Sequence, residues 1–184
     1  MNNFLVRYKG TIFFLVYILL ISGCGYTTHS LLSPKIKSIY VENFTNKVSI
    51  TEEQGDERMY KGYRPGLEID VTKAIIDKFL FDGNLEVVNI NDSDLILKGE
   101  LIDFKKEALR YDRNNNVEEY RVMLVVNLEL KSTRADKAIW KEKEFAGEAT
   151  YRTGGSLATS ESASIKAATS DLARRVVERT VEGW

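Results

Sequence analysis

The stretch Val117 to Lys131, VEEYRVMLVVNLELK, has the clearest periodicity in this chain of 184 residues. Its apolar and polar side chains alternate with a period of two, as in a strand that buries one face. The apolar face carries Tyr120, Val122, Leu124, Val126, Leu128 and Leu130. At about 3.4 Å per residue such a strand spans roughly 50 Å. We therefore predict a long antiparallel strand that bends or projects beyond the rest of the domain.

The sequence on either side of this stretch predicts two partner strands. Asp94 to Phe104 (DLILKGELIDF) is apolar on both faces, with Leu95, Leu97 and Leu101 on one and Ile96, Ile102 and Phe104 on the other. Residues 105–116 are rich in asparagine, which tolerates the backbone of a hairpin end. We therefore expect a hairpin with the central strand. Lys137 to Tyr151 (KAIWKEKEFAGEATY) predicts a further strand, and its many charges are typical of a sheet edge.

Two stripes of apolar residues at spacings of three and four predict helices. They lie in Leu67 to Leu80 and in Ser160 to Glu182. β-branched and aromatic residues predict two more strands, Ile36 to Phe44 and Leu85 to Ile90. The order β-α-β-β-β-β-α indicates an α+β fold. We expect a two-layer α/β sandwich of an antiparallel-rich sheet of four or five strands with two helices on one face.

A long stretch without periodicity, Thr45 to Gly66, separates the first predicted strand from the first helix. Loops of this length in compact domains are usually functional or disordered. One interpretation is a loop that contacts a partner through Met59, Tyr60 and Tyr63. The other is a solvated insertion, and the sequence does not choose between them.

The N-terminus reads as a lipoprotein signal. Basic residues precede the uncharged apolar run Thr11 to Ile21, which is too short to span a membrane. Ile21-Ser22-Gly23-Cys24 matches the bacterial lipobox and holds the only cysteine of the chain. We predict a signal peptide over residues 1–23, lipidation of Cys24, a tether over 24–34 and a single domain over 35–184. An uncleaved N-terminal anchor is the alternative.

The composition excludes several classes of function. The 26 basic and 27 acidic residues give a net charge of −1, without the basic excess of a nucleic-acid-binding protein. The chain lacks the common hydrolase, zinc-protease and phosphate-loop motifs, and its single histidine, His29, has no second histidine with which to share a metal. We expect neither catalysis nor a cofactor. A hydrolase that uses only carboxylates stays as a minor alternative.

A cluster of cations precedes the central strand. Lys105, Lys106, Arg110 and Arg113 could form charge-assisted hydrogen bonds to phosphates of an anionic glycolipid. The alternative is an ordinary mixed-charge surface, because acidic residues are interleaved with these cations: Asp103, Glu107, Asp112, Glu118 and Glu119. We take the four cations as candidate lipopolysaccharide contacts.

Several short motifs, in their order and spacing, are similar to those of the lipopolysaccharide-assembly lipoprotein family LptE. They are Cys24-Gly25-Tyr26, KSIYVENFTN at 37–46, GLEIDVT at 66–72, DLILKGE at 94–100, Glu119-Tyr120-Arg121 and VEGW at 181–184. The resemblance covers the whole chain after the predicted signal. It implies a four-stranded sheet with two helices, one strand fewer than the periodicity predicts.

The same resemblance implies a function. It suggests a lipid-anchored protein on the periplasmic side of the outer membrane that plugs the LptD β-barrel, supports its assembly and binds lipopolysaccharide. The alternative is a periplasmic lipid- or ligand-binding lipoprotein that acts without a barrel. Neither hypothesis requires nucleic acid, a metal or a cofactor.

Overall fold

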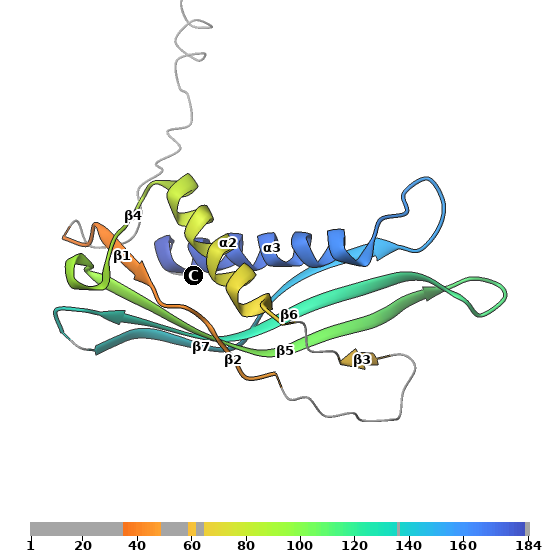
Figure 1. Ribbon diagram of the computed structural model, residues 1–184, viewed down its shortest axis with the longest axis horizontal. Helices are drawn as coiled ribbons and strands as arrows, with labels where there is room; N and C mark the ends of the chain where they lie inside the picture. Colours follow the sequence, from red (N-terminus) through yellow and green to blue (C-terminus); the bar gives the residue numbers. More distant parts are fainter. Residues whose placement is uncertain (1–34, 49–58, 62–64, 136, 183–184) are drawn as a thin grey trace, which may run out of the picture.

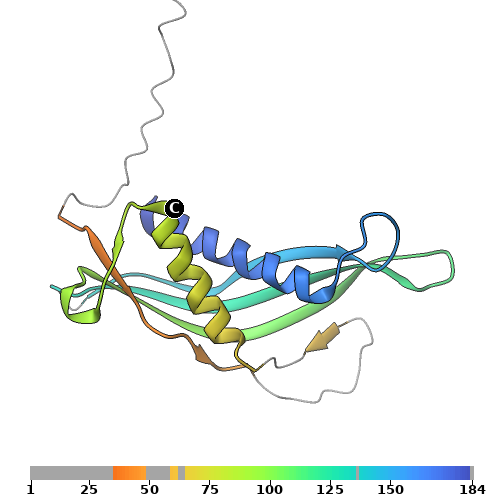
Figure 2. The ribbon, with the colours of Figure 1, turned by 45° about the horizontal axis from the view of Figure 1, so that its top comes forward.

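One mixed sheet forms the first layer of the molecule and two helices form the second, all on the same face of the sheet (Figures 1 and 2). This computed structural model describes residues 35–48, 59–61, 65–135 and 137–182. The helices are α2 (Leu67–Asp82) and α3 (Glu161–Val181). The expected α+β two-layer architecture is confirmed.

The main strands lie in the order β4-β1-β5-β6-β7. Their bounds are β1 Ser38–Val41, β4 Glu86–Val87, β5 Leu95–Tyr111, β6 Val117–Ser132 and β7 Lys137–Arg152. β5, β6 and β7 are antiparallel, whereas β1 runs parallel to both β4 and β5. The sheet is therefore mostly antiparallel, and β7 is the predicted edge strand. A short 3-10 helix, η1 (Ile90–Asp92), connects β4 to β5.

The stretch predicted as a loop, Thr45 to Gly66, contributes to the sheet in two places. β2 (Thr45–Asn46) pairs parallel with β5, and β3 (Met59–Lys61) pairs antiparallel with it. The prediction of a loop was therefore wrong at these residues, because open backbone groups along β5 accept short strands that have no periodicity of their own. Tyr63 lies outside the described residues.

The core lies between the helices and the apolar face of β6. The even-numbered side chains of β6 from Val122 to Leu130 are buried, as the alternation predicts. α2 adds Val71, Ile75 and Phe79, and α3 adds a stripe with the same spacing. The core residues of α3 are Ile165, Ala168, Leu172, Ala173, Val176, Val177 and Val181.

A β-bulge changes the facing of β5. Leu101 pairs with Val126 and Phe104 with Leu124, so Ile102 is an extra residue between them. Phe104 therefore joins Leu101 in the core, although strict alternation places the two on opposite faces. The bulge also gives β5 a local bend that alternation does not reveal.

α3 lies directly against β7. A Cβ atom at Gly147 would lie 2.5 Å from the backbone nitrogen of Leu172 and 2.6 Å from its Cα atom, so only glycine allows this approach. The carboxylate of Asp171 accepts a hydrogen bond from the Glu148 amide at 3.1 Å, and Arg175 donates to the carbonyl of Ala146. These side chains occupy backbone groups at the outer edge of the sheet and protect it from unwanted pairing.

Candidate functional site

The predicted cationic cluster lies on the β5–β6 hairpin, which extends past the first turn of α3 (Figure 1). Lys105 and Lys106 pair with Met123 and Val122 respectively, so the two lysines point to opposite faces of the sheet. Arg110 lies near the end of β5, and Arg113 lies in the exposed turn that follows. The structure therefore divides the cluster into three separate environments.

Lys106 lies on the helix side and joins the hairpin to the start of α3. Its Nζ atom lies 2.6 Å from Oε2 of Glu161 and 4.4 Å from the ring centroid of Tyr120. Tyr120 stacks on Tyr151, with ring centroids 5.4 Å apart. Burial is the largest single influence and opposes the charge of Lys106, but the hydrogen bonds and electrostatic attraction from Glu161 and Tyr151 together outweigh it and raise the pKa of the lysine. The ammonium group of Lys106 is therefore already bound to groups of the same chain.

The face of the sheet away from the helices is predominantly polar, and ion pairs cross its strands. Lys105 lies 3.5 Å from Asp103, and Lys141 lies 2.8 Å from Glu129. Further pairs on this face are Lys98–Glu42, Lys131–Glu129 and Arg121–Glu148. Such exposed pairs add little stability individually. Together they give the sheet an uncovered polar face that can contact water or another polar protein surface.

A third environment lies at the far end of the hairpin. A cavity of about 450 Å³ is lined there by Arg110, Glu119, Arg152 and the Gly154-Gly155 turn, among others. Arg110 lies 3.5 Å from Glu119, while the exposed side chain of Arg152 has no ion pair within the described residues. The register pairs Arg152 with Glu119 across β6 and β7. Sequence analysis missed Arg152, because only strand pairing brings it close to Arg110.

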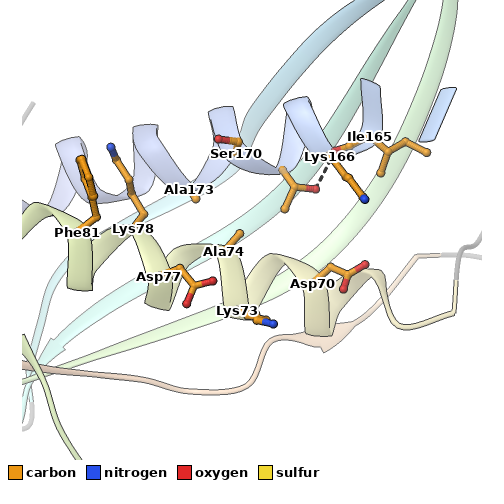
Figure 3. A pocket seen from close by; sticks show the side chains of 11 residues that line it. Asp70, Lys73, Ala74, Asp77, Lys78, Phe81, Ile165, Lys166, Ser170 and Ala173 are labelled. Carbon is orange, nitrogen blue, oxygen red and sulfur yellow. Dashed lines mark hydrogen bonds between the residues drawn. The ribbon is translucent and has the colours of Figure 1, made fainter. Parts of the chain in front are cut away.

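A groove of about 610 Å³ lies between α2 and α3 (Figure 3). Small and apolar side chains, including Ala74, Ala173 and Ile165, line its floor. Charged side chains line the rest of the groove and form no ion pairs within the described part of the chain: Asp70, Lys73, Asp77, Lys78 and Lys166. The groove could bind an amphiphile.

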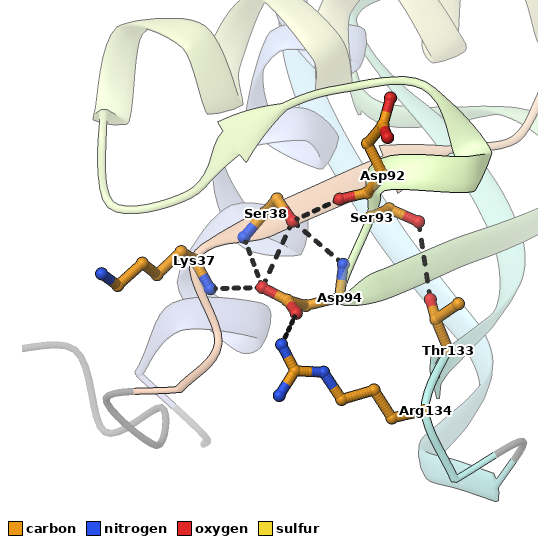
Figure 4. Close-up of polar contacts among 7 residues, drawn as sticks. All are labelled: Lys37, Ser38, Asp92, Ser93, Asp94, Thr133 and Arg134. Carbon is orange, nitrogen blue, oxygen red and sulfur yellow. Dashed lines mark hydrogen bonds and ion pairs between the residues drawn. The ribbon is translucent and has the colours of Figure 1, made fainter.

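A polar network ties the start of β1 to the start of β5 (Figure 4). The carboxylate of Asp94 accepts hydrogen bonds from the Lys37 amide at 2.9 Å and the Ser38 amide at 3.3 Å. Arg134 lies 2.7 Å from the other carboxylate oxygen. The bond from the Lys37 amide is the largest of the causes that lower the pKa of Asp94. This network holds the start of β1 beside the start of β5.

The described residues contain no group of histidine, cysteine and acidic side chains that could hold a metal ion. In that part of the chain, neither helix combines the length and apolar character that a membrane crossing requires. Cys24, the predicted lipidation site, lies outside the described residues.

A model of the lipopolysaccharide-assembly family LptE matches residues 36–180. The chain belongs to the LptE family. Membership implies a role in lipopolysaccharide assembly and indicates a non-catalytic lipoprotein of the cell envelope. A search of curated proteins gave no match.

Solved structures are similar to this LptE-family chain at low sequence identity. CT253 from Chlamydia trachomatis is 10% identical with a TM-score of 0.51, and the match covers 78% of this chain and 95% of that one. A minor lipoprotein from Acinetobacter baumannii is 13% identical with a TM-score of 0.44, covering 80% and 92%. Rare lipoprotein B from Shewanella oneidensis is 12% identical with a TM-score of 0.40, covering 77% and 89%.

The motifs through which the chain resembles LptE proteins meet in the structure. The Phe44 amide donates a hydrogen bond to Oγ1 of Thr72 at 3.0 Å, and the Phe44 ring lies where a Cβ atom at Gly99 would be. Asn46 donates to Glu68 at 3.0 Å. These contacts join the segment after β1 to α2 and β5, so the motifs at 37–46, 66–72 and 94–100 support the fold.

Proposed function

We propose that this chain is a lipoprotein anchored through Cys24 on the periplasmic side of the outer membrane. There it plugs an LptD-like β-barrel, supports the assembly of that barrel and takes part in lipopolysaccharide transport to the cell surface. The family assignment supports the lipopolysaccharide context. Anchoring by Cys24 and insertion into a barrel are the further steps of the proposal.

The long sheet with one uncovered polar face is the observation that carries the barrel proposal. β5, β6 and β7 each contain 16 or 17 residues, so each can span roughly 55 Å. The apolar band of an outer-membrane barrel is about 25 Å tall, and its interior is polar. A sheet of this length can pass through such an interior with its ion-paired face against the barrel wall, while the helices keep the apolar face covered.

Co-purification from native membranes tests the proposal. Lipidated wild-type protein is expected to bring down a large β-barrel, and the double variant Lys98→Glu/Lys141→Glu on the open face is expected to recover roughly ten-fold less of it, since reversed charges oppose polar contacts. The matched control Lys73→Glu/Lys166→Glu reverses two lysines in the groove between the helices and is expected to retain the barrel. Absence of any barrel with the wild-type protein would contradict the proposal.

Lipopolysaccharide contacts are proposed at the end of the hairpin. Arg110 and Arg113 are exposed there, and Arg152 of β7 lines the same cavity as Arg110. Lys105 and Lys106, the other two candidates from the sequence, are only partly exposed beside Asp103 and Glu161, whereas Arg110 is 56% exposed although it lies 3.5 Å from Glu119. Guanidinium groups can bind phosphate with two parallel hydrogen bonds, so we assign the phosphate contacts to the arginines.

Replacing Arg110, Arg113 and Arg152 together by alanine is expected to weaken lipopolysaccharide binding roughly ten-fold or more, because charge-assisted hydrogen bonds to phosphate are lost. The Lys105→Ala variant serves as the control and is expected to bind as the wild type does. Binding can be measured with fluorescently labelled lipopolysaccharide. Equal affinity of the triple variant and the wild type for lipopolysaccharide would show that these arginines do not contribute to binding.

The groove between α2 and α3 favours a second candidate, a lipid-binding lipoprotein that acts alone. Its apolar floor and volume suit one amphiphile. Tight lipopolysaccharide binding that the Lys73→Glu/Lys166→Glu variant abolishes, together with no barrel in the pull-down, would support this candidate over the barrel plug.

A further inference from the structure

Two large apolar side chains are exposed in the last turn of α2. Leu80 is 61% exposed and Phe81 is 84% exposed, the highest value among the large apolar residues that the structure describes. The Nζ atom of Lys78 lies 5.1 Å from the centroid of the Phe81 ring. Gly83 ends the helix with a left-handed backbone, so these side chains occupy a corner of the molecule. The core stripe of α2 does not require either of them.

This corner lies beside the point where the chain enters the domain. The Glu86 amide, four residues after the end of α2, donates a hydrogen bond to the carbonyl of Lys37 at 2.9 Å. β4 then pairs with β1 in the register Ser38 to Glu86. In both views the end of α2, β4 and the start of β1 lie at the same end of the molecule (Figures 1 and 2).

The length of the preceding chain limits how far this corner can be from a lipid anchor. Residues 24–34 number eleven, and a chain of that length spans at most about 40 Å. If Cys24 carries the anchor, as the proposed function states, the entry point of the domain remains within that distance of the membrane. The corner formed by Leu80 and Phe81 is then held at a high effective concentration near lipid.

We propose that Leu80 and Phe81 insert into the interfacial region of the lipid surface to which the chain is anchored. Leucine and aromatic side chains favour this region. Lys78 can lay its aliphatic stem along Phe81 and direct its ammonium group to lipid phosphates. Two adjacent side chains are too small a patch for a stable protein interface, which buries about 800 Å² on each partner. Contact with lipid needs only a shallow apolar insertion and the tether.

Fluorescence quenching in reconstituted vesicles tests the contact. Lipidated full-length Phe81→Trp protein is placed in phosphatidylethanolamine–phosphatidylglycerol vesicles, with and without brominated acyl chains. The matched control is Ile69→Trp, at the other end of α2, where the natural side chain is 67% exposed. Trp140 and Trp184 are common to both variants. We expect bromine to remove about twice as much fluorescence, or more, from the Phe81→Trp variant.

The possible outcomes separate this inference from the proposed function. Flotation of the wild-type protein with vesicles, and its loss in Cys24→Ser, would show the anchor. With the anchor shown, greater quenching of Phe81→Trp supports the contact, and equal quenching of the two tryptophan variants overturns it while leaving the anchor intact. A wild-type protein that does not float contradicts both the anchor and the contact that depends on it.

Discussion

Replacing Gly147 by alanine is expected to lower the free energy of unfolding by about 3 kcal/mol, at the upper end of the cost of overpacking. The added Cβ atom would meet the backbone of Leu172 at 2.5 to 2.6 Å. A rotamer change cannot relieve a clash with a helix backbone, so α3 would have to move away from β7. That movement would also weaken the hydrogen bond that Asp171 accepts from the Glu148 amide and the one that Arg175 donates to the Ala146 carbonyl.

Urea denaturation monitored by circular dichroism measures this effect, with Gly154→Ala as the matched control. A Cβ atom at Gly154 has no atom within 4 Å, and no left-handed backbone is recorded there. The control is therefore expected to stay within about 0.5 kcal/mol of the wild type, as most surface substitutions do. If Gly147→Ala also stays within that range, α3 does not pack as closely against β7 at Gly147 as described above.

The sequence predicts the layers of this fold well, because alternation and helical spacing are local properties. The residues predicted to form the apolar face of β6 and the apolar stripe of α3 lie in the core. The bulge at Ile102 was not predictable in this way, since it depends on the pairing of β5 with β6. For the same reason alternation placed Phe104 on the wrong face.

The candidate site depends even more on pairing. Lys105 and Lys106 are neighbours in the sequence, but successive side chains of a strand point to opposite faces of the sheet. Lys106 donates a hydrogen bond to Glu161, which lies 55 residues away in the sequence. Arg152 reaches the hairpin end only through the register of β6 and β7. The exposed corner of α2, in contrast, has a local signal. Leu80 and Phe81 fall outside the stripe formed by Leu67, Val71, Ile75 and Phe79.

Replacing Asp94 by asparagine is expected to lower the free energy of unfolding by about 2 kcal/mol at pH 7, within the range for hydrogen bonds to a charged group. The carboxylate accepts bonds from two backbone amides at the start of β1, and its side chain is only 16% exposed. Asparagine removes the charge and presents one amide group that cannot accept. The Arg134→Ala variant separates the ion pair from the backbone bonds. Arg134 is 70% exposed, so its loss should cost no more than about 0.5 kcal/mol.

The pH dependence gives this prediction a direction. The native structure lowers the pKa of Asp94, chiefly through the bond from the Lys37 amide, so the unfolded chain binds the proton more readily. The stabilisation is therefore complete above the unfolded pKa and is lost as the pH falls through the lower native value. Urea denaturation of the wild type and Asp94→Asn should show the full difference at pH 7 and a progressively smaller one below about pH 5. A difference that stays constant down to pH 3 would mean that the charge of Asp94 does not hold the start of β1.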